Sequence, residues 1–385
     1  MIKVLHVTED HSARNTGITA AVNALTGCVP ETIRSSIVCV EDEALPSVAQ
    51  VDLSVLPTRG LGRVWRFAPG GATRLSRLVE AADVVHLHGL WMWPQWSAAR
   101  QAYRQGKPFI VTSHGMLRPW MWSRQNILHR TKKFVYWNGI AYPAFRQASA
   151  VHALTTQEAV TLAGYFPGQK PVVIPHSVDL QSVDRIAAQL PPARTDEAPY
   201  FLFLGRLHPV KAVHLLIRAF ARLPDRTFNL RIAGPTQSIE QAYADSLHRL
   251  AVDLELTDRV SFVGPVSGVD KWRLYRDAWA FCLPSFSEVT GMVNLEAAAA
   301  GTPVITSFES GVVDAWEQYG GLRIHPDEES ILAGLQQAAA WNLDERRSRG
   351  KAMRSLIEKE YSWARTGQDW AALYQRLAGG ARGKA

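Results

Sequence analysis

The chain has 385 residues, of which 47% are hydrophobic and 20% are charged, and it has no low-complexity or periodic segment, so neither a disordered chain nor a repeat solenoid is the default expectation. Its length exceeds what one hydrophobic core usually organises, so we expect two domains. The formal net charge of +7 favours anionic partners, and the three cysteines are too few and too scattered for a disulfide framework or a zinc site.

The first strand is predicted at the N-terminus, in "MIKVLHVTED". This apolar run is closed by acids and lacks the length of a signal-peptide core, so a buried strand is the better interpretation. No stretch reaches the roughly 18 apolar residues that a membrane span needs. We therefore expect a cytoplasmic protein with reduced, buried thiols.

Short β-branched runs alternate with amphipathic segments along the chain, which is typical of α/β domains with a doubly wound parallel sheet. The first series is "IKVLHVT", "SSIVCV", "DVVHLHG", "PFIVTSHG", "AVHALT" and "PVVIPHS". After an irregular stretch, a second series follows with "YFLFLGRL", "FNLRIAG", "RVSFVG", "AFCLPS" and "PVITS". The predicted domains are residues 1–185 and 186–360, and a C-terminal helix at about 361–378 is expected to pack back on the first. Ligands should bind where the carboxyl ends of the strands of both domains face a cleft.

Two cations follow the first strand of the second series, in "FLGRLHPVKAVHLL". Arg206 and Lys211 lie five positions apart just past the strand end, where they can converge on a diphosphate without a metal. A solvated basic loop is the commoner role of such residues, so a second signal is needed.

That signal is "FCLPSFSEVTGMVNLEAAAAGTPVIT". A helix is predicted from about Met292 to Gly301, and its first turn, after Gly291, offers free N–H groups to a phosphate. Glu288 precedes the helix and can accept hydrogen bonds from sugar hydroxyls, while Glu296 can accept from the two hydroxyls of a ribose.

Together these motifs resemble the retaining glycosyltransferases of group 1, or family 4, typified by sucrose and glycogen synthases and bacterial mannosyltransferases. The resemblance covers nearly the whole chain and includes the two glutamates, "GRL" with Lys211, "RIAGP", "VSFVGPV" and "AAGTPVI", all in family order. It implies the GT-B fold, with two Rossmann-like domains facing each other across a cleft. The first domain would bind the acceptor and the second the nucleotide sugar.

The resemblance also implies roles for individual residues. Arg206 and Lys211 would neutralise the diphosphate, and the turn ending at Val266 would receive the base. The implied donor-binding residues are Gly17, Gly205, Arg206, Lys211, Gly234, Val266, Glu288, Gly291, Met292, Val293 and Glu296. The implied catalytic residues are His114, Glu288, Arg206 and Lys211, and the implied acceptor-binding residues are His88 and Trp91.

The first domain matches the family pattern less closely. Gly17 occupies the family's glycine loop, but Thr16 stands where a glycine is usual. His114 matches the histidine that forms a hydrogen bond with the donor sugar in relatives. A lone histidine more often has a structural role. Two histidines, His88 and His114, at strand ends facing one cleft make a purely structural role less expected. Val289 and Thr290 replace the usual Gly-Phe, so the preferred donor sugar cannot be carried over from the family.

The implied reaction moves a hexose from a nucleotide diphosphate sugar, of the UDP or GDP type, to a hydroxyl of a saccharide acceptor with retention at the anomeric carbon. No Asp-x-Asp motif is present, so neither a metal nor another cofactor is expected. "HGLW" and "HGMLRPW" resemble enzymes of bacterial surface-polysaccharide assembly, which favours a polyprenyl-diphosphate-linked acceptor.

Basic and aromatic residues also occur together in the first domain, at Arg59, Arg63, Trp65 and Arg66 and in residues 118–133. They suit an anionic membrane surface and predict peripheral attachment to the inner face of the cell membrane. An equally good interpretation places the tryptophans in the core and the charges in solvent.

Two other functions are open. A nucleotide-sugar epimerase or a phosphorylase shares this fold, although no pyridoxal lysine motif is present, and product analysis separates transfer from epimerisation. A protein that binds nucleic acid or another anionic polymer would explain the positive charge but would not need Glu288 and Glu296. No nucleic acid partner is therefore expected.

Overall fold

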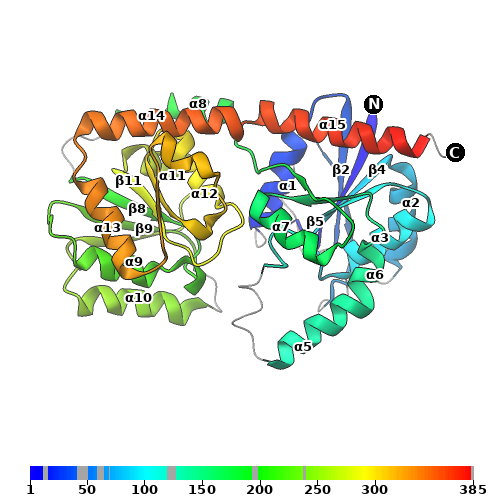
Figure 1. Ribbon diagram of the computed structural model, residues 1–385, viewed down its shortest axis with the longest axis horizontal. Coiled ribbons are helices and arrows are strands. Elements are labelled where there is room, and N and C mark those ends of the chain that lie inside the picture. Colours follow the sequence, from blue (N-terminus) through cyan, green and yellow to red (C-terminus); the bar gives the residue numbers. More distant parts are fainter. Residues whose placement is uncertain are drawn as a thin grey trace. The chain divides into compact units, whose positions relative to one another are not determined.

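The computed structural model describes residues 1–11, 16–40, 51–58, 65–68, 70–118, 127–192, 198–236 and 240–382. The chain forms two compact units, each built on a parallel sheet with helices on both faces (Figure 1). The first unit comprises Met1–Ser177 together with Trp363–Ala385, and the second comprises Val178–Ser362. The predicted α/β class with two doubly wound sheets is confirmed.

The first unit contains a seven-stranded sheet in the order β3-β2-β1-β4-β5-β6-β7, in which the strands pair in parallel. Its strands are β1 (Ile2–Val7), β2 (Ile33–Val40), β3 (Asp52–Leu56), β4 (Val84–His88), β5 (Phe109–Thr112), β6 (Ala150–Ala153) and β7 (Val172–Val173). Its helices are α1 (Thr16–Cys28), α2 (Gly71–Ala81), α3 (Trp93–Arg104), α5 (Ile127–Tyr136), the π-helix η2 (Trp137–Ala141), α6 (Tyr142–Phe145), α7 (Thr156–Tyr165) and α15 (Trp363–Arg382).

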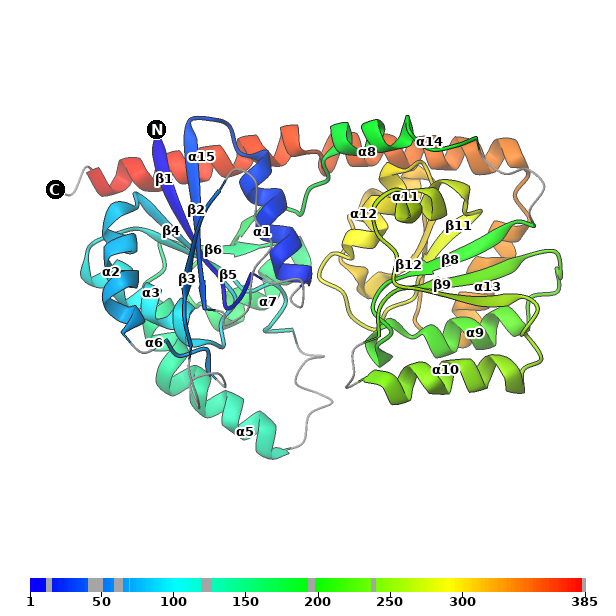
Figure 2. The same cartoon turned by 180° about the vertical axis from the view of Figure 1, so that it is seen from behind.

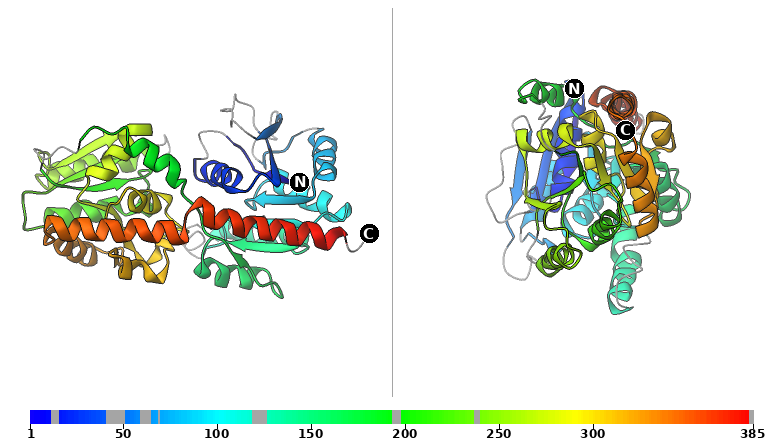
Figure 3. Two further views of the ribbon diagram at one scale, coloured as in Figure 1. Left: turned by 90° about the horizontal axis from the view of Figure 1, so that it is seen from above. Right: turned by 90° about the vertical axis from the view of Figure 1, so that its left-hand side faces the viewer.

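Alternate residues of these strands face opposite sides of the sheet. Leu5 and Val85 pack in the core on the side of α2 and α3, whereas Val4 and Val84 pack in a second core with Tyr374 of α15. Figure 3 shows α15 running along this sheet. The helix approaches α1 so closely that a Cβ at Gly367 would lie 2.0 Å from the carbonyl oxygen of Cys28, which makes glycine necessary there.

The second unit contains a six-stranded parallel sheet in the order β10-β9-β8-β11-β12-β13 (Figure 2). Its strands are β8 (Tyr200–Leu204), β9 (Asn229–Ala233), β10 (Val260–Gly264), β11 (Ala280–Leu283), β12 (Val304–Ser307) and β13 (Leu322–Ile324). Its helices are α8 (Leu180–Ala187), η3 (Pro209–Lys211), α9 (Val213–Ala221), α10 (Gln241–Asp253), α11 (Gly268–Asp277), α12 (Met292–Ala299), η5 (Phe308–Ser310), η6 (Asp314–Tyr319), α13 (Glu328–Ala339) and α14 (Leu343–Glu360). The central strands β8 and β11 are buried along their whole length, as expected of parallel strands covered on both faces.

The boundary between the units differs from the predicted 185/186. The second unit begins at Val178 and includes α8. Val183 of this helix is buried in the second unit's core, and Asp184 forms an ion pair with Arg354 at 2.9 Å. These contacts, which the irregular sequence around the boundary did not reveal, attach α8 to the second unit.

Candidate active site

The loops after β8 and β11 lie at the topological switch point of the second sheet, because the chain order of the strands reverses between these two strands. In open α/β sheets such loops bind ligands. Arg206 and Lys211 follow β8, and Glu288 follows β11. Three of the predicted catalytic residues therefore come from the two loops at this point.

Lys211 and Glu288 form an ion pair between these loops. Their side chains are 16% and 14% exposed, so water shields the pair only weakly. Ser285 Oγ donates a hydrogen bond of 3.0 Å to Glu288 Oε1, and the Glu288 N–H donates to the Glu309 carbonyl at 3.0 Å. The carboxylate is thus fixed from its side chain and from its backbone.

Arg206 contacts a carboxylate that the sequence analysis missed. Its Nη1 lies 2.8 Å from Oε1 of Glu240, whose side chain is only 7% exposed. The other oxygen, Oε2, has no hydrogen-bond partner among the described residues. His208 lies 3.7 Å from the same carboxylate, and burial, followed by the charge of Arg206, lowers the pKa of His208. Arg206 keeps a 42% exposed side chain for another anion.

The two predicted glycines bring the ends of β8 and β9 close together. The Gly205 N–H donates to the Ala233 carbonyl at 3.0 Å. A Cβ at Gly234 would lie 1.9 Å from the Gly205 carbonyl oxygen, and the φ of Gly234 is +142°. Only glycine fits there. Val266, the predicted base contact, follows β10 and is half-buried.

Helix α12 begins as predicted, with Gly291 at its N-cap and Met292 as its first residue. The N–H groups of Met292 and Val293 belong to its first turn, where no intrahelical acceptor is available. This end of the helix is suited to a phosphate.

Glu296, further along α12, is held by two residues of α11. Its Oε1 accepts from Lys271 Nζ at 2.8 Å, and its Oε2 accepts from the Tyr275 hydroxyl at 2.9 Å. Burial, and then the Glu296 charge, raises the pKa of Tyr275 well above its usual value, so this phenol stays a donor. The sequence analysis missed Lys271 and Tyr275. Their spacing of four on one helix was a usable signal, but the helix they face depends on the fold.

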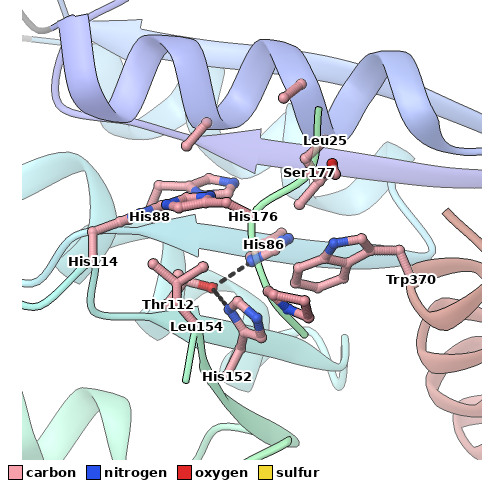
Figure 4. A pocket seen from close by; sticks show the side chains of 13 residues that line it. Leu25, His86, His88, Thr112, His114, His152, Leu154, His176, Ser177 and Trp370 are labelled. Carbon is pink, nitrogen blue, oxygen red and sulfur yellow. Dashed lines mark hydrogen bonds between the residues drawn. The ribbon is translucent and has the colours of Figure 1, made fainter. Parts of the chain in front are cut away.

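In the first unit, a pocket at the carboxyl edge of the sheet is surrounded by imidazoles (Figure 4). The residues that line it include His86, His88, Thr112, His114, His152, His176 and Trp370. Sequence reasoning singled out only two of them, His88 and His114. Burial is the main cause that lowers the pKa of every histidine in this group, to about 3 for His152 and about 4 for His176. The pocket is therefore lined by neutral imidazoles at neutral pH.

His114 stands in a strained turn directly after β5. Its φ is +49°, a left-handed value that a non-glycine residue seldom adopts and that recurs at functional sites. The buried carboxylate of Glu158 fixes this turn, because it accepts from Ser113 Oγ at 2.6 Å and from the Gly115 N–H at 2.8 Å. Its second oxygen accepts from the Leu154 N–H at 2.7 Å. Glu158 is a further residue that the sequence analysis missed.

His88 is only 1% exposed, and both of its ring nitrogens contact other histidines. Its Nε2 lies 3.0 Å from His6 Nδ1, and its Nδ1 lies 3.0 Å from His114 Nε2. Both ring nitrogens of His88 therefore already contact other histidines. Neither is left for the contact with the acceptor substrate that the family resemblance implied.

Among the described residues, His6, His86 and His88 have ring nitrogens within 4.8 Å of one another, a spacing that could hold a metal ion. Hydrogen bonds already account for most of these atoms. His86 contacts the Tyr374 hydroxyl at 2.9 Å and Thr112 Oγ1 at 2.7 Å, in addition to the contact between His6 and His88. Hydrogen bonding thus explains why these ring nitrogens lie close together.

The other predicted residues of the first unit lie nearer the surface. Gly17 is exposed in the first turn of α1, and apart from its own helix backbone and chain neighbours no atom of the described residues lies within 4 Å of the place where a Cβ would stand. Trp91 is half-buried, and Lys133 Nζ lies 5.4 Å from the centroid of its ring.

The predicted membrane segment is described only in part. Arg59, Arg63 and residues 119–126 lie outside the described residues. Trp65 donates to the Trp91 carbonyl at 3.1 Å, and Arg66 pairs with Asp10 at 3.1 Å, so both face the protein. No helix in the described part of the chain combines the length and apolar character needed to cross a bilayer.

Comparison with known proteins defines the class. Residues 21–182 match the family model described as Glycosyltransferase Family 4. Residues 187–355 match the model described as Glycosyl transferases group 1. The chain therefore belongs to the group 1 glycosyltransferases of family 4.

Curated relatives include D-inositol 3-phosphate glycosyltransferases. The chain is 35% identical to the enzyme of Kribbella flavida over 234 residues, which are 57% of this chain and 53% of the relative. It is 29% identical to that of Stackebrandtia nassauensis over 315 residues, which are 76% of this chain and 68% of the relative. The first of these matches thus spans about half the length of the relative.

Solved structures show the same fold. Anabaena HepE, solved in complex with UDP and glucose, gives a TM-score of 0.74 at 16% identity, covering 98% of this chain and 100% of that one. The sucrose-phosphate synthase of Thermosynechococcus elongatus also gives 0.74, at 19% identity, covering 99% of this chain and 100% of that one. The fold is GT-B, as the sequence predicted.

Proposed function

We propose that the protein is a retaining, metal-independent hexosyltransferase that uses a nucleotide diphosphate sugar of the UDP or GDP type. The observation that carries this proposal is the pairing of Lys211 with Glu288 at the switch point of the second unit's sheet. A half-buried cation and a fixed carboxylate side by side suit a donor that has a diphosphate at one end and sugar hydroxyls at the other.

The second unit would bind the nucleotide. Arg206 and Lys211 supply positive charge in the loop after β8, and the N–H groups of Met292 and Val293 lie in the first turn of α12. Together these groups would meet the charge that develops on the departing diphosphate. The ribose would bind to Glu296, whose two oxygens are oriented by Lys271 and Tyr275 but keep lone pairs for further donors. Gly205, Gly234 and Val266 would lie along the phosphates and the base.

The first unit would bind the acceptor. His114 and Glu288 would bind hydroxyls of the transferred sugar, and Gly17 would approach the diphosphate. No residue is assigned as a nucleophile. The leaving phosphate would take the proton of the acceptor hydroxyl on the same face of the sugar, which accounts for retention.

For the acceptor we propose a saccharide hydroxyl, carried on a polyprenyl diphosphate and contacted by Trp91. Inositol 3-phosphate is the acceptor named for the curated relatives, and it is the competing candidate. Both candidates carry phosphate as well as hydroxyl groups, which fits the formal net charge of +7.

Helix α5 supports peripheral attachment to an anionic membrane. Leu128, Phe134 and Val135 are 62%, 65% and 62% exposed, although large apolar side chains are usually buried. The exposed cations Arg130 and Lys132 lie on the same helix. A helix with exposed apolar and basic side chains is suited to lie in the headgroup region of a bilayer.

Calorimetry with UDP and GDP, followed by product analysis, tests the proposal. We expect one nucleotide to bind without added metal, and incubation of the matching nucleotide sugars with candidate acceptors to give a glycoside whose anomeric configuration, read by NMR, equals that of the donor. An epimerised nucleotide sugar with no glycoside would favour an epimerase, and binding of anionic polymers without nucleotide binding would favour a polymer-binding protein. An inverted product, or a strict need for a metal ion, would contradict the mechanism.

A further inference from the structure

Two chains of hydrogen bonds cross the α15 face of the first unit's sheet. One links His6, His88 and His114, and the other runs from Tyr374 through His86, Thr112 and His152 to the Ile174 carbonyl. The side chains lie side by side because β1, β4, β5 and β6 are neighbours in the sheet. Neutral imidazole has one N–H donor and one acceptor nitrogen, so each chain has a direction.

A backbone carbonyl sets the direction of the second chain. The Ile174 carbonyl can only accept, so His152 carries its proton on Nε2, at 2.8 Å from that oxygen. Its Nδ1 must then accept from Thr112 at 2.9 Å. Thr112 in turn accepts from Nε2–H of His86 at 2.7 Å, and this part of the network is fully satisfied (Figure 4).

The direction of the first chain follows from its buried end. His6 is 0% exposed, and its Nε2 has no hydrogen-bond partner among the described residues. An orphaned buried N–H is rarer than an orphaned acceptor, so the proton of His6 is on Nδ1. His6 Nδ1–H then donates to His88 Nε2 at 3.0 Å, and His88 Nδ1–H donates to His114 Nε2 at 3.0 Å.

We propose that His6 and His88 fix the tautomer of His114, so that His114 carries its proton on Nδ1 and presents an N–H donor to an oxygen of the bound ligand. This inference rests on the proposed function for its ligand, a hydroxyl or phosphate oxygen of the sugar nucleotide. His6 and His88 are positioning residues, and His88 acts through His114 rather than by touching the acceptor.

The surroundings keep the chain neutral. Burial is the main cause that lowers the pKa of His6 to about 3 and holds the pKa values of His88 and His114 well below 6.5. A neutral His114 with an acceptor nitrogen towards the ligand would repel a phosphate oxygen and could only accept from a hydroxyl, so the direction of the chain decides which hydrogen bond His114 makes.

Ring-nitrogen NMR of the full-length protein, labelled with ¹⁵N-histidine, tests the tautomer without any assay of activity. Signals of His114 are assigned by their loss in His114→Ala. We expect a protonated Nδ1 and an unprotonated Nε2. A protonated Nε2 would overturn the proposal, as would stoichiometric zinc or another transition metal found by elemental analysis of the purified protein, because the same nitrogens would then be ligands.

Variants of His6 test the positioning role at a residue that lies two hydrogen bonds away from His114 and does not touch the ligand. His6→Leu removes the donor to His88, and we expect turnover to fall roughly 10-fold or more, as when an orienting partner of a functional histidine is lost. Affinity for the nucleoside diphosphate should change much less than turnover, since most of its proposed contacts lie in the second unit. His6→Asn places an amide N–H where Nδ1–H stood and should restore most of the turnover.

Tyr374→Phe is the matched control. It removes a buried hydroxyl from the second chain, at 2.9 Å from His86, and leaves the first chain intact. Its turnover and the His114 tautomer should match the wild type. Equal turnover in His6→Leu and the wild type, or equal losses in His6→Leu and Tyr374→Phe, would contradict the positioning role. If no transferase activity exists, the NMR result still decides the tautomer, so the two failures are distinguishable.

Discussion

The carboxyl edges of the two sheets hold polar side chains in opposite ways. In the second unit the groups are charged and paired, as in Lys211 with Glu288 and Lys271 with Glu296. In the first unit they are imidazoles kept neutral by burial, such as His88 and His152. The paired charges suit a diphosphate, whose charge grows during transfer, and the neutral donors suit sugar hydroxyls. The same kind of sheet thus supports two kinds of polar chemistry.

The largest expected difference between the two units is in their stability at mildly acidic pH. The pKa values of His6 and His152 are lowered to about 3 in the folded state, whereas an unfolded histidine titrates near 6.5. Between these values the unfolded state binds more protons, so the free energy of unfolding falls as the pH falls, by about 1.4 kcal/mol per pH unit for each histidine.

Hydrogen exchange at pH 7 and pH 5.5, corrected for intrinsic rates, measures this difference. We expect β4 and β5 of the first unit to lose protection while β8 and β11 of the second keep it, since ordinary carboxylates titrate at lower pH. Equal changes in both units would show that the buried histidines do not control acid stability.

Loss of either Lys211 or Arg206 should impair the proposed site in the second unit. Lys211→Ala and Arg206→Ala should each lower turnover by about 100-fold or more, because each would remove a preorganised charge from the proposed diphosphate site. Steady-state kinetics with the nucleotide sugar that product analysis shows to be the donor would measure the loss. Arg222→Ala is the matched control, since Arg222 pairs with Glu329 on the surface at 2.6 Å. Near-normal rates in both site variants would remove the diphosphate role.

Membrane attachment would distinguish the first unit in a further way. Replacing Arg130 and Lys132 of α5 with alanine should weaken binding to anionic vesicles by about 30-fold, at roughly 1 kcal/mol per cation, and salt should weaken wild-type binding. Co-sedimentation with phosphatidylserine vesicles provides the measurement, and Arg185→Ala with Arg218→Ala in the second unit is the control pair. Equal pelleting of both double variants, or none by the wild type, would exclude a role for α5.

The smallest expected effect concerns the ribose contact. Glu296→Gln replaces one acceptor oxygen with an N–H₂ group that faces Lys271 or Tyr275, and nucleoside diphosphate affinity should fall about 10-fold with the fold intact. Calorimetry measures the affinity, and circular dichroism checks the fold. Glu345→Gln, on the surface of α14, should bind like the wild type. Unchanged binding by Glu296→Gln would refute the ribose assignment.

Much of the fold follows from local sequence. Apolar β-branched runs predicted the central strands, and Gly291 with Gly301 bracketed α12 correctly. The short edge strands β3 and β13 were not predicted, because an edge strand is only half covered and needs no continuous apolar run. The 185/186 boundary missed α8 for a similar reason, since a helix with few apolar residues shows its attachment only in its contacts.

The sequence by itself determined which charged residues lie at strand ends, because a buried parallel strand is recognised by its apolar run and the loop begins where that run ends. It placed Arg206, Lys211 and Glu288 in such loops, and the structure joins Lys211 to Glu288. Tertiary structure alone decided the partners that orient the other groups, such as Glu240 beside Arg206. The histidine chains are the clearest case. Alternation along β4 puts His86 and His88 on one face, but the order of the strands, which is a long-range property, decides that His6 and Thr112 are their neighbours.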